Sequence, residues 1–435
     1  MQKLLDRFSL HYLIVGLIIA IPVYPKFPLF SVPGTFVSVR LEDFILLVTF
    51  LVLIVKSLPK VGLLLKDRSL AALLIFLLVS GLSLASGIFI TQTVSIHIGI
   101  LHWLRRLEYF TPFLLGLVTK HDKAHLKLYL ACFVFVLGYV FLYGFLQKHA
   151  NLPIVTTQNQ EYSKGVALRY TPGGHINSTF AGHYDLASFL ILVVPLFYTT
   201  FFCFKDKLSK LALALAVLAS LWLLVNSVSR ISIVSYLFAT IIALVLIKKF
   251  KAIFVAVVVS IVFIAFSSNL LARYSAIFEV MLDKIVSRVV VLADGGETQP
   301  VVEDRSTSIR LNVEWPRAIR AFVKNPLLGT GFSSITLATD NDYLRLLGET
   351  GLVGLVAFVT ILLTLVRLIL SRVAKPINFG LNTAWAAAFS GSFFGICLNA
   401  VFIDVFESSK FAILFWLMAG IFVSLSRSKN LDAKN

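Results

Sequence analysis

Apolar and polar residues are segregated along this chain into long blocks. Apolar stretches alternate with polar connections, and a helix needs about twenty apolar residues to cross the hydrocarbon core of a bilayer. The pattern therefore predicts an all-α fold, a polytopic transmembrane bundle of about twelve helices that forms a single integral membrane domain over residues 1–435. The apolar windows are residues 9–27, 41–58, 69–90, 98–118, 125–147, 180–203, 208–227, 230–247, 252–269, 347–367, 381–403 and 410–426.

Composition excludes the water-soluble classes of protein. Of the 435 residues, 58% are hydrophobic and only 14% are charged, which is too little polar surface to cover a soluble domain. The cysteines all lie inside apolar windows, and their spacing matches neither a disulfide framework nor a metal site. We therefore expect Cys132, Cys203 and Cys397 to be small buried apolar residues.

The basic residues alternate between the two sides of the predicted bundle. If the N-terminus is cytoplasmic, the inner connections and the two termini hold 21 Lys and Arg residues, against 7 on the outer side apart from the long connection that precedes residue 347. This bias places both termini in the cytoplasm. The net charge of +17 then reflects topology. Since no soluble basic face carries it, we expect no nucleic-acid partner.

Two connections on the predicted outer side are long, residues 148–179 and residues 270–340, which lie between the ninth and tenth windows. A turn-rich stretch at 294–300 is followed by helical periodicity, whose start Asp304 or Ser306 could cap. The pattern predicts an amphipathic helix lying on the membrane surface. Its apolar stripe is Ile309, Val313, Ile319 and Phe322.

Arginine is concentrated on the predicted outer side. Its planar guanidinium grips phosphate or carboxylate through two parallel hydrogen bonds, so an anionic ligand bound outside would explain the bias. Contact with lipid head groups and surface solvation is the alternative. The outer arginines are Arg40, Arg169, Arg230, Arg273, Arg288, Arg305, Arg310, Arg317 and Arg320.

The positions of some of these arginines in the sequence favour a role in anion binding. Arg230 lies in a short hairpin where the next window begins, and a helix N-terminus together with an arginine suits an anion. Arg310 and Arg317 are seven residues apart with Glu314 between them, which puts all three on one helical face. A solvated, salt-bridged face is the alternative for this trio, and Pro316 is expected to kink the helix.

Charged residues also occur inside or at the ends of the windows. Arg105, Arg106 and Glu108 lie within the fourth window, where charge is costly unless it faces a polar cavity. We expect one arginine to face such a cavity, and the other to pair with Glu108 or to reach the interface. His183 and Asp185 open the sixth window, where helix capping is the alternative to ligand binding.

Carboxylates cluster where the long outer connection ends and again near the last window. Asp340 and Asp342 could act as a base or orient an arginine, although aspartates at helix starts are also ordinary caps. Asp404 and Glu407 lie at the outer mouth of the bundle again, where a structural role is the alternative.

Several short motifs follow one another along the second half of the chain. They are Ser227-Val-Ser-Arg230, residues 310–315, Asn325-Pro-Leu-Leu-Gly-Thr-Gly331, Asn341-Asp-Tyr-Leu344 and Glu349-Thr-Gly-Leu-Val-Gly354. Their order resembles the O-antigen polymerase and ligase superfamily, membrane glycosyltransferases that act on undecaprenyl-diphosphate-linked glycans. The resemblance extends over about residues 100–426, and it implies that Arg169, Arg230 and Arg310 grip the diphosphate.

One position departs from the family pattern. Many members have a histidine before the Asn-x-Tyr-Leu run, where this sequence has Asp340, and ligases more often keep that histidine. This departure leaves the choice between ligase and polymerase open. The hypothesis is a polymerase of lipid-linked repeat units, active on the extracytoplasmic side of the bacterial inner membrane. A ligase that transfers the glycan to lipid A core is the alternative within the family.

The hypothesis assigns catalysis to Arg169, Arg230, Arg310 and Asp340, with Asp404 and Asp185 as the other candidate bases. Arginines would stabilise the departing diphosphate, so no metal or cofactor is expected. The expected partners are lipid-linked glycans, membrane lipids and a chain-length regulator protein. An anion or solute transporter is the alternative from another class, but inverted repeats and broken helices in matching positions are not apparent. The substrate-binding candidates are Arg105, Arg106, His183, Asp185, Arg317, Asn341, Tyr343 and Asp404.

Overall fold

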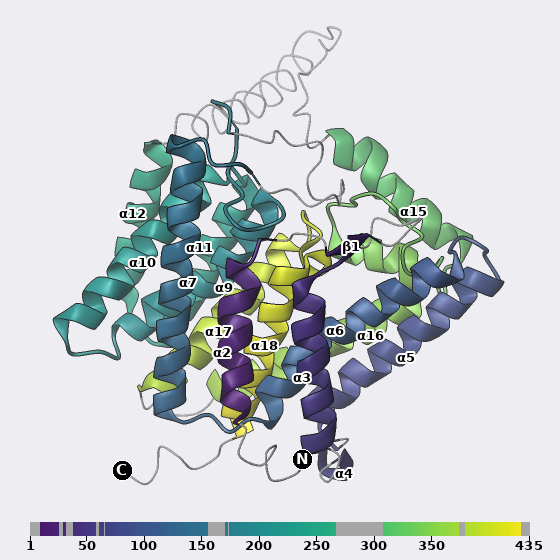
Figure 1. The fold of residues 1–435 in the computed structure, drawn as a ribbon, viewed down its shortest axis with the longest axis horizontal. Coiled ribbons are helices and arrows are strands. Elements are labelled where there is room, and N and C mark those ends of the chain that lie inside the picture. Colours follow the sequence, from purple (N-terminus) through teal and green to yellow (C-terminus); the bar gives the residue numbers. More distant parts are fainter. Residues whose placement is uncertain are drawn as a thin grey trace, which may run out of the picture.

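The computed structural model of the chain is almost entirely helical (Figure 1). The exception among the described residues is a short antiparallel pair, β1 (Phe30–Ser31) and β2 (Ser38–Val39). The structure describes residues 9–25, 29–31, 38–57, 61–64, 66–154, 170–172, 174–266, 308–373 and 379–427.

Each of the twelve apolar windows coincides with a helix, which confirms the all-α prediction. Aspartates that accept a backbone N–H start three of these helices: Asp67 caps α5, Asp122 caps α7 and Asp206 caps α10. The helices are α2 (Leu10–Val23), α3 (Leu41–Ser57), α5 (Arg68–Phe89), α6 (Ile96–Val118), α7 (Lys123–His149), α9 (His183–Phe201), α10 (Lys207–Asn226), α11 (Arg230–Leu246), α12 (Phe250–Ala265), α16 (Asp342–Val373), α17 (Leu381–Asn399) and α18 (Ser409–Arg427), with the single turn α4 (Val61–Leu64) between α3 and α5.

Seven of these helices, α5, α7, α9, α10, α16, α17 and α18, are long and apolar enough to cross a membrane. The chain is therefore an integral membrane protein. The other five windows form helices that are shorter or more charged: α2, α11 and α12 are apolar but have 14, 17 and 16 residues. The 17 residues of α3 begin at two carboxylates, and α6 carries charges at its middle. Length and composition thus support seven of the predicted twelve spans directly.

Burial separates the inner helices from the outer ones. Of the most apolar stretch of each helix, 89% is buried in α18 and 83% in α9, but only 39% in α10 and 33% in α16. A helix that is apolar on every side must meet protein or lipid. The core is therefore built around α9, α17 and α18, while α10 and α16 present apolar faces to lipid, for example Leu208, Leu211, Leu215 and Leu218 of α10.

The start of α18 lies against the end of α2. The buried Lys410 ammonium donates to the carbonyls of Pro22 (3.3 Å), Tyr24 (2.6 Å) and Thr179 (2.7 Å). Since α2 ends where α18 begins, α2 begins and α18 ends at the opposite end of the bundle. The start of α2 and the end of α18 therefore share one end of the bundle, while the location of the two termini in the cytoplasm stays a prediction.

Two glycines allow α6 and α18 to pack closely. A Cβ atom on Gly116 would lie 2.6 Å from the backbone nitrogen of Ile421, and one on Gly420 would lie 2.2 Å from the carbonyl oxygen of Phe113. Small residues let helix backbones approach within a membrane, where no hydrophobic effect drives them together.

Alanine at Gly116 is expected to push α6 away from α18 and to lower the free energy of unfolding by about 1–3 kcal/mol, as overpacking usually does. Unfolding of the purified protein in mixed micelles measures this change. The matched control is Gly138→Ala in α7, where a Cβ atom meets nothing within 4 Å. The control should leave stability unchanged or raise it by up to about 1 kcal/mol. Equal effects of the two substitutions would contradict the close packing.

Candidate functional site

A helix precedes the re-entry of the chain into the bundle at α16, as predicted. It begins with a π-helical turn, Arg310–Glu314, and continues as α15 (Trp315–Lys324). Pro316, expected to kink the helix, is the second residue of α15, and the wider turn lies directly before it. This turn interrupts the single α-helical face predicted for Arg310, Glu314 and Arg317. Apolar side chains exposed along the segment suit a membrane surface; they are Ile309, Leu311, Val313, Ile319 and Val323.

Arg310, at the start of this helix, forms an ion pair with Asp340, which lies two residues before the start of α16. The Nε and Nη2 atoms of Arg310 both donate to Oδ2 of Asp340, at 3.2 Å and 2.9 Å. The side chains are 14% and 7% exposed. Asp340 holds a left-handed backbone conformation with φ of 49°, which is uncommon outside glycine. The two hydrogen bonds to Asp340 fix the plane of the Arg310 guanidinium. Among the described residues, no side chain accepts a hydrogen bond from Nη1 of Arg310.

Charge around Arg310 favours its cationic form. Burial alone would lower the pKa of the guanidinium, but the Asp340 carboxylate, the Tyr184 phenol and Glu314 together raise the pKa above its ordinary value. Arg310 thus remains a fixed positive charge with little access to solvent, which strengthens its attraction for an anion.

The Arg310–Asp340 pair lies near the start of α9, because Tyr184 is among the groups that act on Arg310. The His183 ring lies between two other rings, with its centre 4.0 Å from that of Tyr184 and 3.9 Å from that of His175. Asp185 is buried in the first turn of α9. The structure therefore places two predicted substrate-binding residues, His183 and Asp185, at the end of the bundle where Arg310 and Asp340 meet.

Arg230 is the first residue of α11, as predicted. The hydroxyl of Ser229 beside it lies 2.6 Å from that of Ser232, which donates to Oδ1 of Asn399 (3.2 Å), and Asn399 donates to Ser188 of α9 (3.1 Å). This chain of hydrogen bonds joins α11 and α17 to α9 one turn beyond Asp185. Arg169, the third predicted diphosphate grip, lies outside the described residues.

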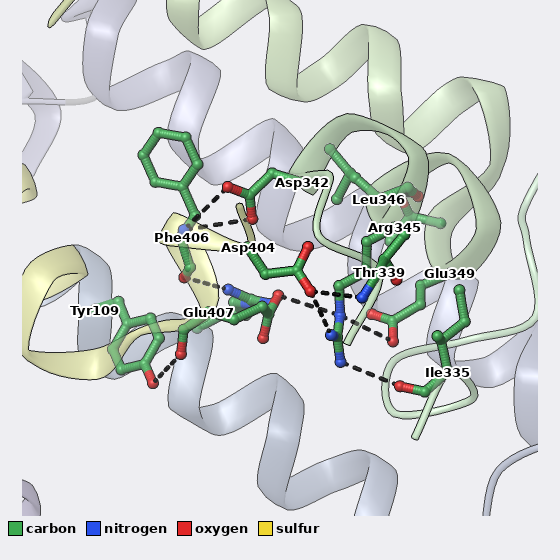
Figure 2. A network of polar contacts seen from close by, with 12 residues as sticks. Tyr109, Ile335, Thr339, Asp342, Arg345, Leu346, Glu349, Asp404, Phe406 and Glu407 are labelled. Atoms are coloured by element: carbon green, nitrogen blue, oxygen red, sulfur yellow. Dashed lines mark hydrogen bonds and ion pairs between the residues drawn. The ribbon is translucent and has the colours of Figure 1, made fainter. Parts of the chain in front are cut away.

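A buried polar network joins the start of α16 to the turn before α18 (Figure 2). Asp404 accepts from the backbone N–H groups of Thr339 (2.8 Å) and Asn341 (3.0 Å), and from the Arg345 guanidinium (3.2 Å). Arg345 also donates to the carbonyl of Ile335 (3.1 Å) and lies 3.7 Å from a carboxylate oxygen of Glu349. Asp404, predicted as a substrate-binding residue or base, therefore organises the backbone that carries Asp340.

A reciprocal contact completes this network. Asp342 accepts from the backbone N–H groups of Val405 (2.8 Å) and Phe406 (3.2 Å), which belong to a 3-10 turn, η3 (Val405–Glu407). Thus a carboxylate from each segment binds the backbone of the other. We call this arrangement the aspartate clasp, formed by Asp342 and Asp404.

Arg106 of α6 contacts the turn η3, whose backbone Asp342 binds in the aspartate clasp. It forms an ion pair with Glu407 and donates to the carbonyl of Phe406 (2.9 Å). It lines a cavity of about 30 Å³ together with Asp342, Glu349 and Glu407. Such a cavity holds about two water molecules, not a sugar. Arg106 therefore faces a small cavity, as expected of one of the two arginines, but aromatic and aliphatic residues such as Phe76 and Trp416 form most of its lining.

Arg105 does not line the cavity at Arg106. Its guanidinium lies 3.8 Å from the Asp43 carboxylate of α3. The sequence suggested Glu108 as a partner for one of these arginines, because a pair within one helix is visible in the sequence. Asp43 could not be identified in that way, since its proximity depends on the packing of α3 against α6.

The remaining predicted substrate-binding residues have identifiable contacts or positions. The Asn341 side chain accepts from the N–H of Leu344 (2.9 Å) and so caps α16. The Tyr343 hydroxyl donates to the carbonyl of Cys397 (3.0 Å), which ties α16 to α17. Arg317 is half-buried on α15. Within the described part of the chain, no three His, Cys, Asp or Glu side chains lie close enough together to hold a metal ion.

Two of the sequence motifs bind each other through their backbones. The N–H of Gly331 donates to the carbonyl of Glu349 (2.7 Å), and the N–H of Leu352 donates to the carbonyl of Pro326 (2.9 Å). Gly351 has φ of 67°, and a Cβ atom there would lie 2.4 Å from the carbonyl oxygen of Leu327. Residues 325–331 and 349–354 are therefore scaffold, which explains their glycines.

Comparison with protein-family models matches residues 214–359 to a family described as O-antigen ligase. The matched range contains Arg230, Arg310, Asp340 and Arg345, and it leaves out the start of α9 and the turn that carries Asp404. A search of curated proteins finds no match.

Proposed function

Because residues 214–359 belong to the O-antigen ligase family, whose members are membrane glycan-transferring enzymes, we propose that this chain polymerises diphosphate-linked oligosaccharide repeat units. The observation that carries the proposal is the buried Arg310–Asp340 pair, which lies inside the matched range and beside the start of α9. The charge bias of the connections supports an extracytoplasmic site on a bacterial cytoplasmic membrane.

In the proposed reaction, a hydroxyl of the acceptor sugar attacks the anomeric carbon of the donor glycan. A new glycosidic bond forms, the bond between that carbon and the diphosphate oxygen breaks, and the lipid diphosphate leaves with the electron pair. The proton lost by the hydroxyl goes to a carboxylate. Negative charge develops on the leaving oxygen, so a fixed arginine there lowers the barrier.

The contacts suggest a role for each group. Arg310, held in plane by Asp340, retains donors at Nη1 that fit a phosphate oxygen. Arg230 at the start of α11 would add a second cation together with the helix N-terminus. Asp340 is the preferred proton acceptor, because it lies against Arg310, whereas Asp404 holds the backbone amides of Thr339 and Asn341 within the aspartate clasp.

Transfer to lipid A core is the second candidate, since the matching family is described as O-antigen ligase. Asp340, which stands where ligases more often have histidine, favours polymerisation. A chain-length regulator would act on a polymerase but has no role in ligation.

Reconstitution of the purified protein in liposomes with labelled lipid-linked repeat units tests the proposal. We expect products that lengthen by whole repeat units. Adding lipid A core as a competing acceptor distinguishes the two candidates, because a ligase would move label to the core without lengthening the glycan. Flux of an anion across the liposome membrane with neither product would contradict both candidates and identify a transporter.

A further inference from the structure

At the end of α9 away from the Arg310–Asp340 pair, α9, α10 and α12 surround an apolar hollow of about 450 Å³. Its walls include Phe197 and Phe201 of α9, Ala214 and Leu218 of α10, and Val255 of α12. Leu218 and Val255 are 42% and 55% exposed, so the hollow opens on the outer surface of the bundle. In Figure 1, α10 and α12 lie at one edge of the molecule. The hollow is therefore open to membrane lipid.

The size and lining of the hollow suit a hydrocarbon chain. Its volume lies within the range of ligand pockets, about 300–1,000 Å³. Nearly all the side chains that line the hollow are aromatic or aliphatic. The hydroxyl of Tyr198 accepts a hydrogen bond from that of Tyr236 (3.3 Å). An apolar chain would thus fill the space without leaving a polar group unpaired.

Lysines surround the hollow. Lys251 is part of its lining. The ammonium of Lys249 lies 5.1 Å from the centre of the Phe202 ring, and that of Lys210 lies 5.7 Å from the centre of the Phe201 ring. Both rings line the hollow, so three cations lie at or beside it.

The charge here is not neutralised by acidic residues. The connections before α10 and α12 and the first turns of these helices hold six lysines and one acidic residue, Asp206. Asp206 accepts from the N–H of Ser209 and so caps α10. Among the described residues, Lys210, Lys249 and Lys251 form no ion pair. A long apolar space beside three unneutralised cations complements an anionic phospholipid, with an acyl chain inside and the phosphate over the lysines.

We propose that this hollow, which we call the α9–α12 hollow, is a binding site for an anionic phospholipid. The site is independent of glycan transfer, because it lies at the opposite end of α9 from Arg310 and uses none of the same residues. The hollow binds the acyl chain of the lipid and the lysines bind its head group. The protein therefore prefers phosphatidylglycerol to phosphatidylethanolamine, which has similar acyl chains but no net charge.

Native mass spectrometry of the full chain in detergent, titrated with phosphatidylglycerol or phosphatidylethanolamine, tests the site. The double variant Lys249→Gln, Lys251→Gln should weaken phosphatidylglycerol binding by about fivefold for each lysine removed, which corresponds to about 1 kcal/mol per charge. The matched control, Lys120→Gln with Lys123→Gln, removes two exposed lysines from another connection on the same predicted side and should change nothing.

A second variant tests the apolar part of the site. Ala214→Phe fills the hollow and should reduce the binding of both lipids, whereas the lysine variant affects phosphatidylglycerol alone. Equal affinity of the unmodified protein for the two lipids would overturn the proposal. So would equal phosphatidylglycerol binding by the Lys249–Lys251 variant and its control, or an unchanged affinity after Ala214→Phe.

Discussion

Replacing Arg310 with lysine is expected to lower the rate of glycan transfer by about 10²–10³-fold, the usual effect of removing one group that stabilises charge in a transition state. Lysine keeps the charge but loses the planar fork, so it cannot bind Asp340 through two nitrogens and still direct a donor to the diphosphate. The rate of elongation in liposomes measures the effect. Protein abundance and melting temperature are measured on the same preparation.

The matched control is Arg320→Lys, on the exposed face of α15. It should transfer glycan at the rate of the unmodified protein, because Arg320 lies on the same helix but away from Asp340. Asp340→Asn should also slow transfer, since it removes the carboxylate that fixes Arg310. If Arg310→Lys and Arg320→Lys had the same small effect, Arg310 would not bind the leaving group.

Replacing Arg345 with methionine is expected to destabilise the protein by about 3–5 kcal/mol, the cost of leaving buried charges without their partner. Glu349 and Asp404 are only 2% and 3% exposed, so water cannot replace the guanidinium. Unfolding in mixed micelles gives the change in free energy.

Arg367→Met is the matched control, because Arg367 is an exposed arginine of α16 beyond the kink at Gly351. It should alter stability by less than about 0.5 kcal/mol. Loss of glycan transfer in Arg345→Met without loss of stability would contradict the scaffold role and would place Arg345 in the chemistry.

The positions of the helices could be predicted from the sequence because a bilayer imposes a length of apolar chain on each span. The boundaries differ where polar residues are buried by protein. The tenth window was expected to begin at residue 347, but α16 begins at Asp342. Gly351 has non-helical backbone angles and divides α16 by a kink, so the turns that carry Asp342, Arg345 and Glu349 precede the apolar part of α16. The charges of these three residues meet partners in the aspartate clasp and around it.

The candidate site was only partly predictable. Arg310 and Asp340 were both singled out for their chemistry, but their contact depends on how residues 311–339 fold back. Arg345 was overlooked, although its spacing of four residues from Glu349 is a signal for an ion pair on a helix. The role of Asp404 was not visible either, because its partners at Thr339 and Asn341 are backbone amides, which have no signature in the sequence.

The aspartate clasp has an energetic consequence for any ligand that the neighbouring residues receive. Loops that become ordered only on association lose conformational freedom at that moment, and affinity falls by the same amount. Here Asp342 and Asp404 fix the backbone of both segments through hydrogen bonds within the protein, so this loss is met during folding of the polypeptide. Oligosaccharides of different lengths would therefore meet the same preformed backbone beside Asp340.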